Sequence, residues 1–258
     1  MPDTALITGA TSGIGAEFAD QLAARGCNVV LVARNVDRLE EACRRLEDAH
    51  GVDAEYVQAD LTVRVDVDRV AARLADADRP VDILVNNAGY GLMTKFADST
   101  VEVEQGNLDI LVGAPMRLSH AAIGPMLDRR RGRIINIASV AGHTPRGTYG
   151  AHKAWLISFS RWANIEYAHR GVTTTAVVAG FTRTEFHQRM DARTDNIPGW
   201  MWLSKERLVR EALADADAGK ATSTPSKRYK VLSVLARNAP QSIVAKVARK
   251  GREAKPGR

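Results

Sequence analysis

A tyrosine and a lysine four positions apart, Tyr149 and Lys153, form the pair best suited to proton chemistry in this sequence. On an α-helix this spacing places both side chains on one face, one turn apart. An unperturbed tyrosine has a pKa of about 10, too high for a base at neutral pH, and a nearby ammonium group lowers that pKa by stabilising the phenolate. Ser139, ten positions before the tyrosine, could hydrogen-bond a substrate oxygen and stabilise its developing charge.

Each of these three residues also has a plain structural interpretation. A tyrosine at this position could be a half-buried packing residue, the lysine a solvated helix residue and the serine part of a turn. Taken singly, each is better explained in that way. Their combination behind a glycine-rich loop favours the catalytic interpretation.

That loop lies near the N-terminus, where TGATSGIG spans residues 8–15. A short apolar run precedes it and a helical pattern follows it, which is the setting that a phosphate-binding loop requires. Glycines let the backbone turn tightly and approach a pyrophosphate, which rests on the helix N-terminus. The alternative is a glycine-rich turn without a ligand. The residues expected to contact a dinucleotide here are Gly9, Thr11, Ser12, Gly13, Ile14 and Gly15.

Five landmarks in order, between Thr4 and about Phe186, resemble the short-chain dehydrogenase/reductase family. They are TGxxxGxG at residues 8–15, NNAG at residues 86–89, Ser139, and the tyrosine and lysine of YxxxK at residues 149–153. Each motif alone is common, but five in the correct order make coincidence improbable. The resemblance implies an oxidoreductase in which Tyr149 exchanges a proton with a carbonyl or secondary alcohol while the cofactor carries the hydride.

The resemblance also implies further contacts and an assembly. In this family the lysine that corresponds to Lys153 holds the nicotinamide ribose, and Tyr149 is also expected to contact the cofactor. Members commonly form dimers or tetramers, so we expect a homo-oligomer. For Asp60 a helix-capping role is the alternative, and both roles can hold at once. The remaining cofactor contacts that the family implies are Asp60, Leu61, Asn87, Ala88, Gly89 and Thr184.

The end of the second apolar run indicates which cofactor is used. Dehydrogenases that prefer NAD place an acidic residue there, where it bonds the adenine ribose hydroxyls. This sequence has Ala33 followed by Arg34, so no acid repels a 2′-phosphate and a guanidinium is available to pair with it. We therefore expect NADP(H), although Arg34 could also be a solvated loop residue.

Three positions depart from the family pattern. The serine and tyrosine are a little closer in sequence than usual, and Ala179-Gly180 replaces the family's Pro-Gly. Aligned through Arg117, the family's catalytic asparagine falls on Leu111, which has no donor or acceptor with which to hold a water. Asn107, four residues earlier, could hold a displaced water or simply solvate the helix. A nucleotide sensor without turnover is therefore a competing hypothesis.

The arrangement of apolar segments predicts the fold that positions these residues. Short apolar runs alternate with longer helical patterns, which is typical of a doubly wound, Rossmann-like parallel sheet with helices on both faces, the α/β class. The runs expected to be strands are Ala5–Thr8, Val29–Ala33, Ala54–Val57, Ile83–Val85, Arg133–Ala138 and Thr173–Val178. The helical patterns are Ile14–Arg25, Val36–His50, Val65–Ala77, Val101–Arg129 and Thr148–His169.

Beyond Gly180 the pattern changes. We expect a helix over Ser204–Ala218 with Ser204 as its N-cap, and a short last strand within residues 219–225. Residues 1–225 would then form one oxidoreductase domain, residues 181–203 a substrate flap, and residues 226–258 a basic appendage. Trp200, Met201, Trp202 and Leu203 make the flap apolar, either to pack it on the domain or to cover an apolar substrate.

Charge and composition exclude several classes of protein. The net charge is +6, but residues 226–258 carry +9 and the remainder −3, so the main domain gives no reason to expect nucleic-acid binding. The tail has apolar stripes around Val231 and Ile243 beside basic residues, so it could make weak contact with an anionic membrane; an oligomer arm or a solvated tail is the alternative. The two cysteines form no metal motif, so we predict no metal site, and we expect a cytoplasmic protein without a signal peptide.

Overall fold

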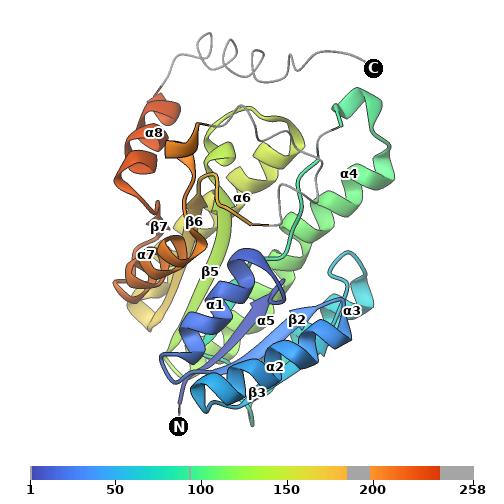
Figure 1. The fold of residues 1–258 in the computed structure, drawn as a ribbon, viewed down its shortest axis with the longest axis vertical. Helices are drawn as coiled ribbons and strands as arrows, with labels where there is room; N and C mark the ends of the chain where they lie inside the picture. The colour runs from blue at the N-terminus through green and yellow to red at the C-terminus, as the bar shows by residue number, and fades with distance from the viewer. Residues whose placement is uncertain (1, 93, 185–197, 239–258) are drawn as a thin grey trace.

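The computed structural model describes residues 2–92, 94–184 and 198–238. Seven parallel strands form one twisted sheet in the order β3-β2-β1-β4-β5-β6-β7, with helices on both faces (Figure 1). This confirms the predicted doubly wound α/β sheet. The strands are β1 (Thr4–Thr8), β2 (Asn28–Ala33), β3 (Ala54–Gln58), β4 (Ile83–Asn86), β5 (Gly132–Ser139), β6 (Val172–Ala179) and β7 (Thr222–Ser223).

The helices match most of the predicted ranges to within a few residues. They are α1 (Gly13–Ala23), α2 (Val36–His50), α3 (Arg64–Ala75), α4 (Val101–Leu108), α5 (Ala114–Asp128), α6 (Gly147–Tyr167), α7 (Lys205–Asp217) and α8 (Lys227–Asn238). Short 3₁₀ turns lie at Phe96–Asp98, Val140–His143, Ala168–Arg170 and Gly199–Met201. The predicted helix over residues 101–129 was only partly right, because a π-helical turn at Asp109–Gly113 separates α4 from α5.

The central strands are buried on both faces, which is why their sequences are apolar without alternation. On one face the core contains side chains of α1, α2 and α7, including Phe18, Leu46 and Leu208. On the other face the helices α3 and α5 contribute, among others, Val70 and Leu118, and α6 packs beside them. No helix among the described residues is long and apolar enough to span a bilayer.

Local sequence explains where several helices begin and end. Asn35 caps α2, its side chain accepting a hydrogen bond from the Arg38 amide at 2.8 Å, and Gly51 ends that helix with a φ of +66°. Ser204 caps α7 as predicted, accepting from the Arg207 amide at 3.3 Å. These caps fix the lengths of the helices that flank the sheet.

The chain beyond residue 225 is helical at first and packs on the sheet domain. In α8, Tyr229 is buried, whereas the apolar residues Val231, Val234 and Leu235 are exposed. The second apolar stripe, after Pro240, lies outside the described residues. The predicted membrane contact therefore stays a prediction.

Candidate active site

The residues predicted to do chemistry meet at the carboxyl edge of the sheet. Thr8 ends β1, Ser139 ends β5, and Ala179 ends β6. The chain runs from β1 to β2 in one direction and later to β4 in the other, so a topological switch point lies between β1 and β4. In open α/β sheets, ligands bind in the crevice at such a point.

The glycine-rich loop is shaped so that no side chain fits inside it. Gly9 and Gly13 have φ values of +66° and +57°, which side chains disfavour. A Cβ on Gly15 would lie 2.2 Å from the Gly9 carbonyl oxygen. Ser12 is the N-cap of α1, but its side chain makes no capping hydrogen bond. The Ser12 hydroxyl therefore does not occupy the amides of the first helical turn. The loop can therefore receive an anion on backbone amides.

The NNAG segment holds this loop in place. Asn87 donates from Nδ2 to the carbonyl oxygens of Thr8 at 2.8 Å and Gly9 at 3.3 Å. The backbone amides of Asn87 and Ala88 both donate to Thr8 Oγ1, which itself donates to the Val85 carbonyl. Thr8 is not among the contact residues predicted from the sequence, although it is the first residue of the glycine motif. In the structure the Asn87 side chain binds the loop directly.

A cluster of charged residues flanks the loop at the end of β2. Arg34 Nη1 lies 3.8 Å from Asp60 Oδ2, and the Arg34 side chain is 76% exposed. Burial raises the pKa of Asp60, but hydrogen bonds from Thr62 and the charge of Arg34 outweigh it, so the pKa falls below its usual value. Leu61 is buried beside it. The Asp60 side chain turns back to Thr62, and α3 begins after Val63.

Arg38 is not among the residues predicted from the sequence. It lies in the first turn of α2, and its Nη2 donates to the Thr11 carbonyl of the glycine loop at 3.2 Å. A second guanidinium therefore stands beside the loop. The sequence signal is an arginine four residues after Arg34, in the first turn of the helix predicted over Val36–His50.

Tyr149, Ser139 and Lys153 lie together. The Tyr149 hydroxyl and the Ser139 side chain are hydrogen-bonded. Lys153 Nζ lies 5.8 Å from the centroid of the Tyr149 ring and donates to the Ile137 carbonyl at 2.6 Å. Ile137 and Ser139 both belong to β5. One strand therefore supplies the hydrogen-bond partners of both Lys153 and Tyr149 on α6.

Burial sets the proton affinities of this group. It raises the pKa of Tyr149 to about 12, against a smaller lowering by the Ser139 hydrogen bond. It also lowers the pKa of Lys153 to about 8. From the sequence, the ammonium of Lys153 is expected to lower the pKa of Tyr149. In the structure desolvation is the larger effect, because it disfavours the charged form of both groups.

Leu111 lies in the π-helical turn and is 1% exposed. It fills the space next to Gly89, where an added Cβ would lie 2.4 Å from Leu111 Cδ2. Asn107 is fully buried one turn earlier, and its Nδ2 donates to the Tyr90 carbonyl at 2.9 Å. Its Oδ1 lies 3.1 Å from Nδ1 of His152. A carboxamide oxygen only accepts, so His152 carries its proton on Nδ1.

The contact with Asn107 leaves His152, which lies within the YxxxK turn, partly buried and facing α4. Burial lowers its pKa, with a further lowering from Lys153 and an opposing contribution from Glu104. The pairing is invisible in the sequence, because it depends on where α4 lies against α6.

The chain that leaves β6 returns to the glycine loop. A Cβ on Gly13 would lie 3.3 Å from Thr184 Cβ, so Thr184 stands against the loop. Trp202 lies 6.0 Å from Phe181 between ring centroids, and Arg183 lies over the Trp202 ring at 5.7 Å. Trp200 is 56% exposed, while Leu203 is buried. Residues 185–197 of the predicted flap lie outside the described residues.

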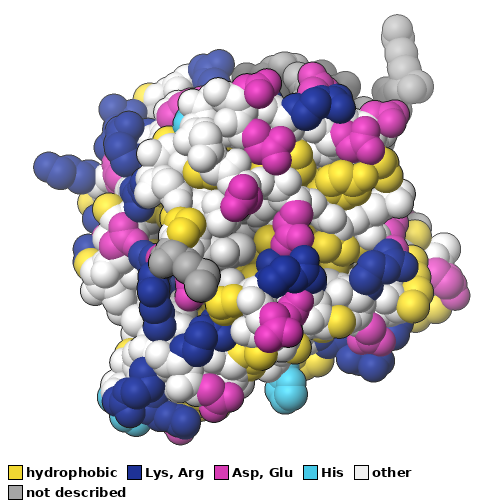
Figure 2. Space-filling model, turned by 90° about the horizontal axis from the view of Figure 1, so that it is seen from below, with side chains coloured by type: hydrophobic (Ala, Val, Ile, Leu, Met, Phe, Trp, Pro, Cys, Tyr) yellow, Lys and Arg dark blue, Asp and Glu magenta, His cyan; other side chains and the backbone are white. Residues whose placement is uncertain are grey.

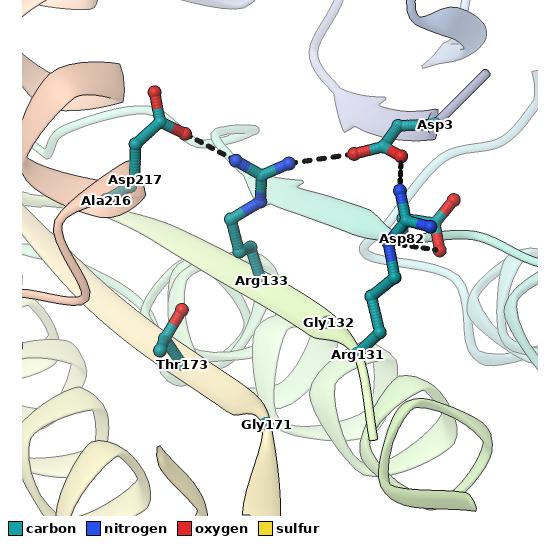
Figure 3. A pocket seen from close by; sticks show the side chains of 9 residues that line it. All are labelled: Asp3, Asp82, Arg131, Gly132, Arg133, Gly171, Thr173, Ala216 and Asp217. Atoms are coloured by element: carbon teal, nitrogen blue, oxygen red, sulfur yellow. Dashed lines mark hydrogen bonds and ion pairs between the residues drawn. The ribbon is translucent and has the colours of Figure 1, made fainter. Parts of the chain in front are cut away.

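A polar cavity at the opposite edge of the sheet is a different kind of place. Arg133 lies between Asp3 and Asp217, and Arg131 pairs with Asp3 and Asp82 (Figure 3). The surface seen from this side mixes both signs of charge (Figure 2). Each guanidinium is matched by carboxylates: Asp3 and Asp82 lie just before β1 and β4, and Asp217 ends α7. The cavity is therefore a structural ion-pair network, remote from the carboxyl edge where Ser139 lies.

Comparison with known proteins places the chain among enzymes of one type. The sequence model described as short chain dehydrogenase matches residues 3–195. An uncharacterized oxidoreductase of Staphylococcus epidermidis is 34% identical over 202 residues, which cover 75% of this chain and 86% of the relative. Two solved structures are similar over the whole chain, one of them bound to NADPH.

The NADPH-bound structure is a short-chain dehydrogenase from Sphingobium yanoikuyae, 32% identical, with a TM-score of 0.82 over 100% of this chain and 99% of that one. The second is a bulky-bulky ketone specific alcohol dehydrogenase from Comamonas testosteroni. It is 30% identical, with a TM-score of 0.77 over 100% of this chain and 97% of that one.

Proposed function

The chain belongs to the short-chain dehydrogenase family, and on this basis we propose that it transfers a hydride between NADP(H) and a ketone, aldehyde or secondary alcohol. The observation that carries the proposal is the convergence of three groups at the end of β5. Tyr149 is hydrogen-bonded to Ser139, and the Lys153 ammonium lies 5.8 Å from the centre of the tyrosine ring. Such a group can move one proton to or from an oxygen atom.

The cofactor fits the loop that would hold it. A Cβ on Gly15 would clash with the Gly9 carbonyl oxygen, so the loop needs glycine there and presents bare backbone. The first turn of α1 carries no acidic side chain to repel a pyrophosphate. Gly9, Thr11, Ser12, Gly13, Ile14 and Gly15 would hold the phosphates, Asp60, Leu61, Asn87, Ala88 and Gly89 the adenosine side, and Tyr149, Lys153 and Thr184 the nicotinamide ribose side. When bound, the nicotinamide supplies or accepts the hydride.

NADP(H) is the form that the charges favour. Arg34 is exposed just after the end of β2, and Arg38, in the first turn of α2, stands against the glycine loop. A guanidinium binds phosphate with parallel hydrogen bonds. The neighbouring carboxylate, Asp60, is held by Thr62 and is already paired with Arg34. The NADPH complex of the Sphingobium yanoikuyae relative agrees with this assignment.

The three residues divide the proton work in reduction. Ser139 hydrogen-bonds the carbonyl oxygen and stabilises the charge that develops on it. Tyr149, whose pKa of about 12 keeps it protonated at neutral pH, donates its proton to that oxygen. The phenolate that remains is stabilised by the Lys153 ammonium, and Tyr149 then recovers a proton from solvent. In oxidation the same steps run in reverse.

The substrate is proposed to be apolar around its carbonyl group. Phe181, Trp202 and Leu203 gather where the chain leaves β6, on the same edge as Ser139. Binding pockets for small molecules are mostly lined by such side chains. The Comamonas testosteroni relative is a bulky-bulky ketone specific alcohol dehydrogenase, which agrees with this class of substrate.

Leu111 supports a second candidate function, a nucleotide sensor without turnover. Leucine cannot hold a proton-relaying water, and it is packed against Gly89. We favour the enzyme because the chemical step would need Ser139, Tyr149 and Lys153, and these three side chains lie together at the end of β5. Loss of a relay slows the return of the proton to Tyr149 without removing it.

Turnover of NADPH on a panel of ketones and aldehydes of increasing apolar bulk tests the proposal. The enzyme hypothesis predicts NADPH oxidation with at least one carbonyl and faster reaction for bulkier apolar members. The sensor hypothesis predicts NADPH binding, measured by calorimetry, and no oxidation with any member of the panel. Failure to bind NADPH would contradict both.

A further inference from the structure

Helix α8 begins beyond the residues that the family model matches, yet it is anchored to the edge that carries the site. Tyr229 on this helix is 3% exposed. Its hydroxyl accepts a hydrogen bond from the Phe181 amide at 2.9 Å and donates one to the Met201 carbonyl at 2.7 Å. A single side chain therefore binds the backbone near both ends of the segment that connects β6 to α7.

Gly180 is the residue on which the Tyr229 ring rests. A Cβ on Gly180 would lie 2.1 Å from Cζ of the ring, a separation that no packed structure tolerates. Gly180 has no positive φ. A side chain is therefore excluded at this position by contact with the Tyr229 ring and not by backbone strain. The glycine and the tyrosine thus form one fitted contact between β6 and α8.

The start of α8 is itself held firmly. Ser226 adopts a φ of +79°, and its amide donates to Glu211 Oε2 of α7 at 2.7 Å. Arg228 Nη1 donates to the Trp200 carbonyl at 2.7 Å. These bonds fix where Tyr229 stands, so it can act as an anchor for less regular backbone.

The backbone that Tyr229 binds, at Phe181 and Met201, is continuous with the residues at the site. The Leu203 amide donates to the Phe181 carbonyl at 2.8 Å, and the Arg183 amide donates to the Leu203 carbonyl at 3.1 Å. One residue further on, Thr184 stands against Gly13 of the glycine loop. Helix α8 also packs on the turn Val140–His143, directly after Ser139. The hydroxyl of Tyr229 therefore sets the path of the backbone between the loop and the Ser139 edge.

We propose that Tyr229 is a positioning residue for the carbonyl substrate: through Phe181 and Met201 it fixes the wall of the site that residues 181–184 and 201–203 build. The substrate part of this inference rests on the proposed function. It assigns the specificity of the site in part to α8, although no side chain of that helix takes part in the proton transfer. Tyr229→Phe removes both hydrogen bonds and keeps the ring on Gly180, so we expect the fold to survive.

The test compares Tyr229→Phe with a matched control, Tyr56→Phe. The Tyr56 hydroxyl also makes a side-chain hydrogen bond, to Glu40 at 3.1 Å, but on β3 at the far edge of the sheet. Hydrogen–deuterium exchange of residues 181–184 and 201–203 should speed up about tenfold in Tyr229→Phe only, since the Phe181 amide loses its acceptor. KM for the preferred ketone should rise about three- to tenfold, with kcat within about threefold.

A second variant approaches the contact from the other side. Gly180→Ala keeps the hydroxyl but displaces the ring, so it should raise KM in the same way. Unchanged exchange in Tyr229→Phe overturns the positioning role, even in a protein without turnover. Faster exchange with KM unchanged in both variants overturns the link to substrate. Absence of NADPH oxidation by the unaltered protein counts against the proposed function. The hydrogen–deuterium exchange result alone then tests whether Tyr229 positions the backbone.

Discussion

Replacement of Arg34 by alanine should lower the affinity for NADPH and leave the affinity for NADH nearly unchanged. Arg34 follows the last residue of β2, and in this structure its guanidinium is 3.8 Å from Asp60 and largely exposed. A 2′-phosphate is the one feature that distinguishes NADPH from NADH. The variant therefore removes a charge that only one of the two cofactors can use.

The size of the effect follows from that exposure. Two unit charges about 4 Å apart attract by about 1 kcal/mol in water and by about 4 kcal/mol at an effective dielectric constant near 20. With a side chain 76% exposed, Arg34 belongs near the lower limit. A loss of about 1–2 kcal/mol corresponds to a roughly 5- to 30-fold weaker Kd for NADPH. Arg38, beside Thr11, remains to supply part of the attraction.

Calorimetric titration of both cofactors measures this change, at low and at high salt. Arg79→Ala is a suitable control, because Arg79, between the end of α3 and the start of β4, has a side chain 59% exposed and is paired with Glu55 and Asp76. We expect the loss in Arg34→Ala to shrink as salt screens the phosphate. Equal weakening of NADPH and NADH, or NADH binding to the unaltered protein as tightly as NADPH, would refute the electrostatic argument.

Two further predictions concern the proton path. The rate of reduction should be nearly constant up to neutral pH and fall as pH rises through about 8, where Lys153 loses its proton, while Tyr149 stays protonated to about 12; a pre-steady-state pH profile that rises through this range would contradict the assignment. Leu111→Asn should change kcat by less than Tyr149→Phe does, because the relay acts after the chemical step; steady-state rates that appear only in Leu111→Asn would favour the sensor hypothesis.

The parts of this molecule that could be predicted are those that local sequence encodes. Buried parallel strands require continuous apolar runs, and a tight phosphate loop requires glycines, so β2 and the loop through Gly15 are both legible. Helix caps such as Asn35 and Ser204 are equally local. Ser139, Tyr149 and Lys153 could be predicted as site residues from the motif resemblance, and helix periodicity places Tyr149 and Lys153 on one face.

The rest depends on contacts between segments far apart in sequence. Nothing near Asn107 indicates that its partners are Tyr90 and His152, because that depends on how α4 approaches α6. The π-helical turn around Leu111 has no sequence signature of its own. The fit of Tyr229 on Gly180 joins positions 49 apart, so the glycine gives no hint of its partner.

The most direct test of the central claim is single-turnover hydride transfer. NADPH-loaded protein is mixed rapidly with a ketone that it reduces in the panel, and the loss of NADPH is followed in the unaltered chain and in Tyr149→Phe. The account predicts transfer in the unaltered chain and a rate at least about 10²-fold lower in Tyr149→Phe, with NADPH affinity nearly unchanged. Transfer in Tyr149→Phe within about a factor of two of the unaltered rate, or no transfer by the unaltered protein while NADPH is bound, would contradict it.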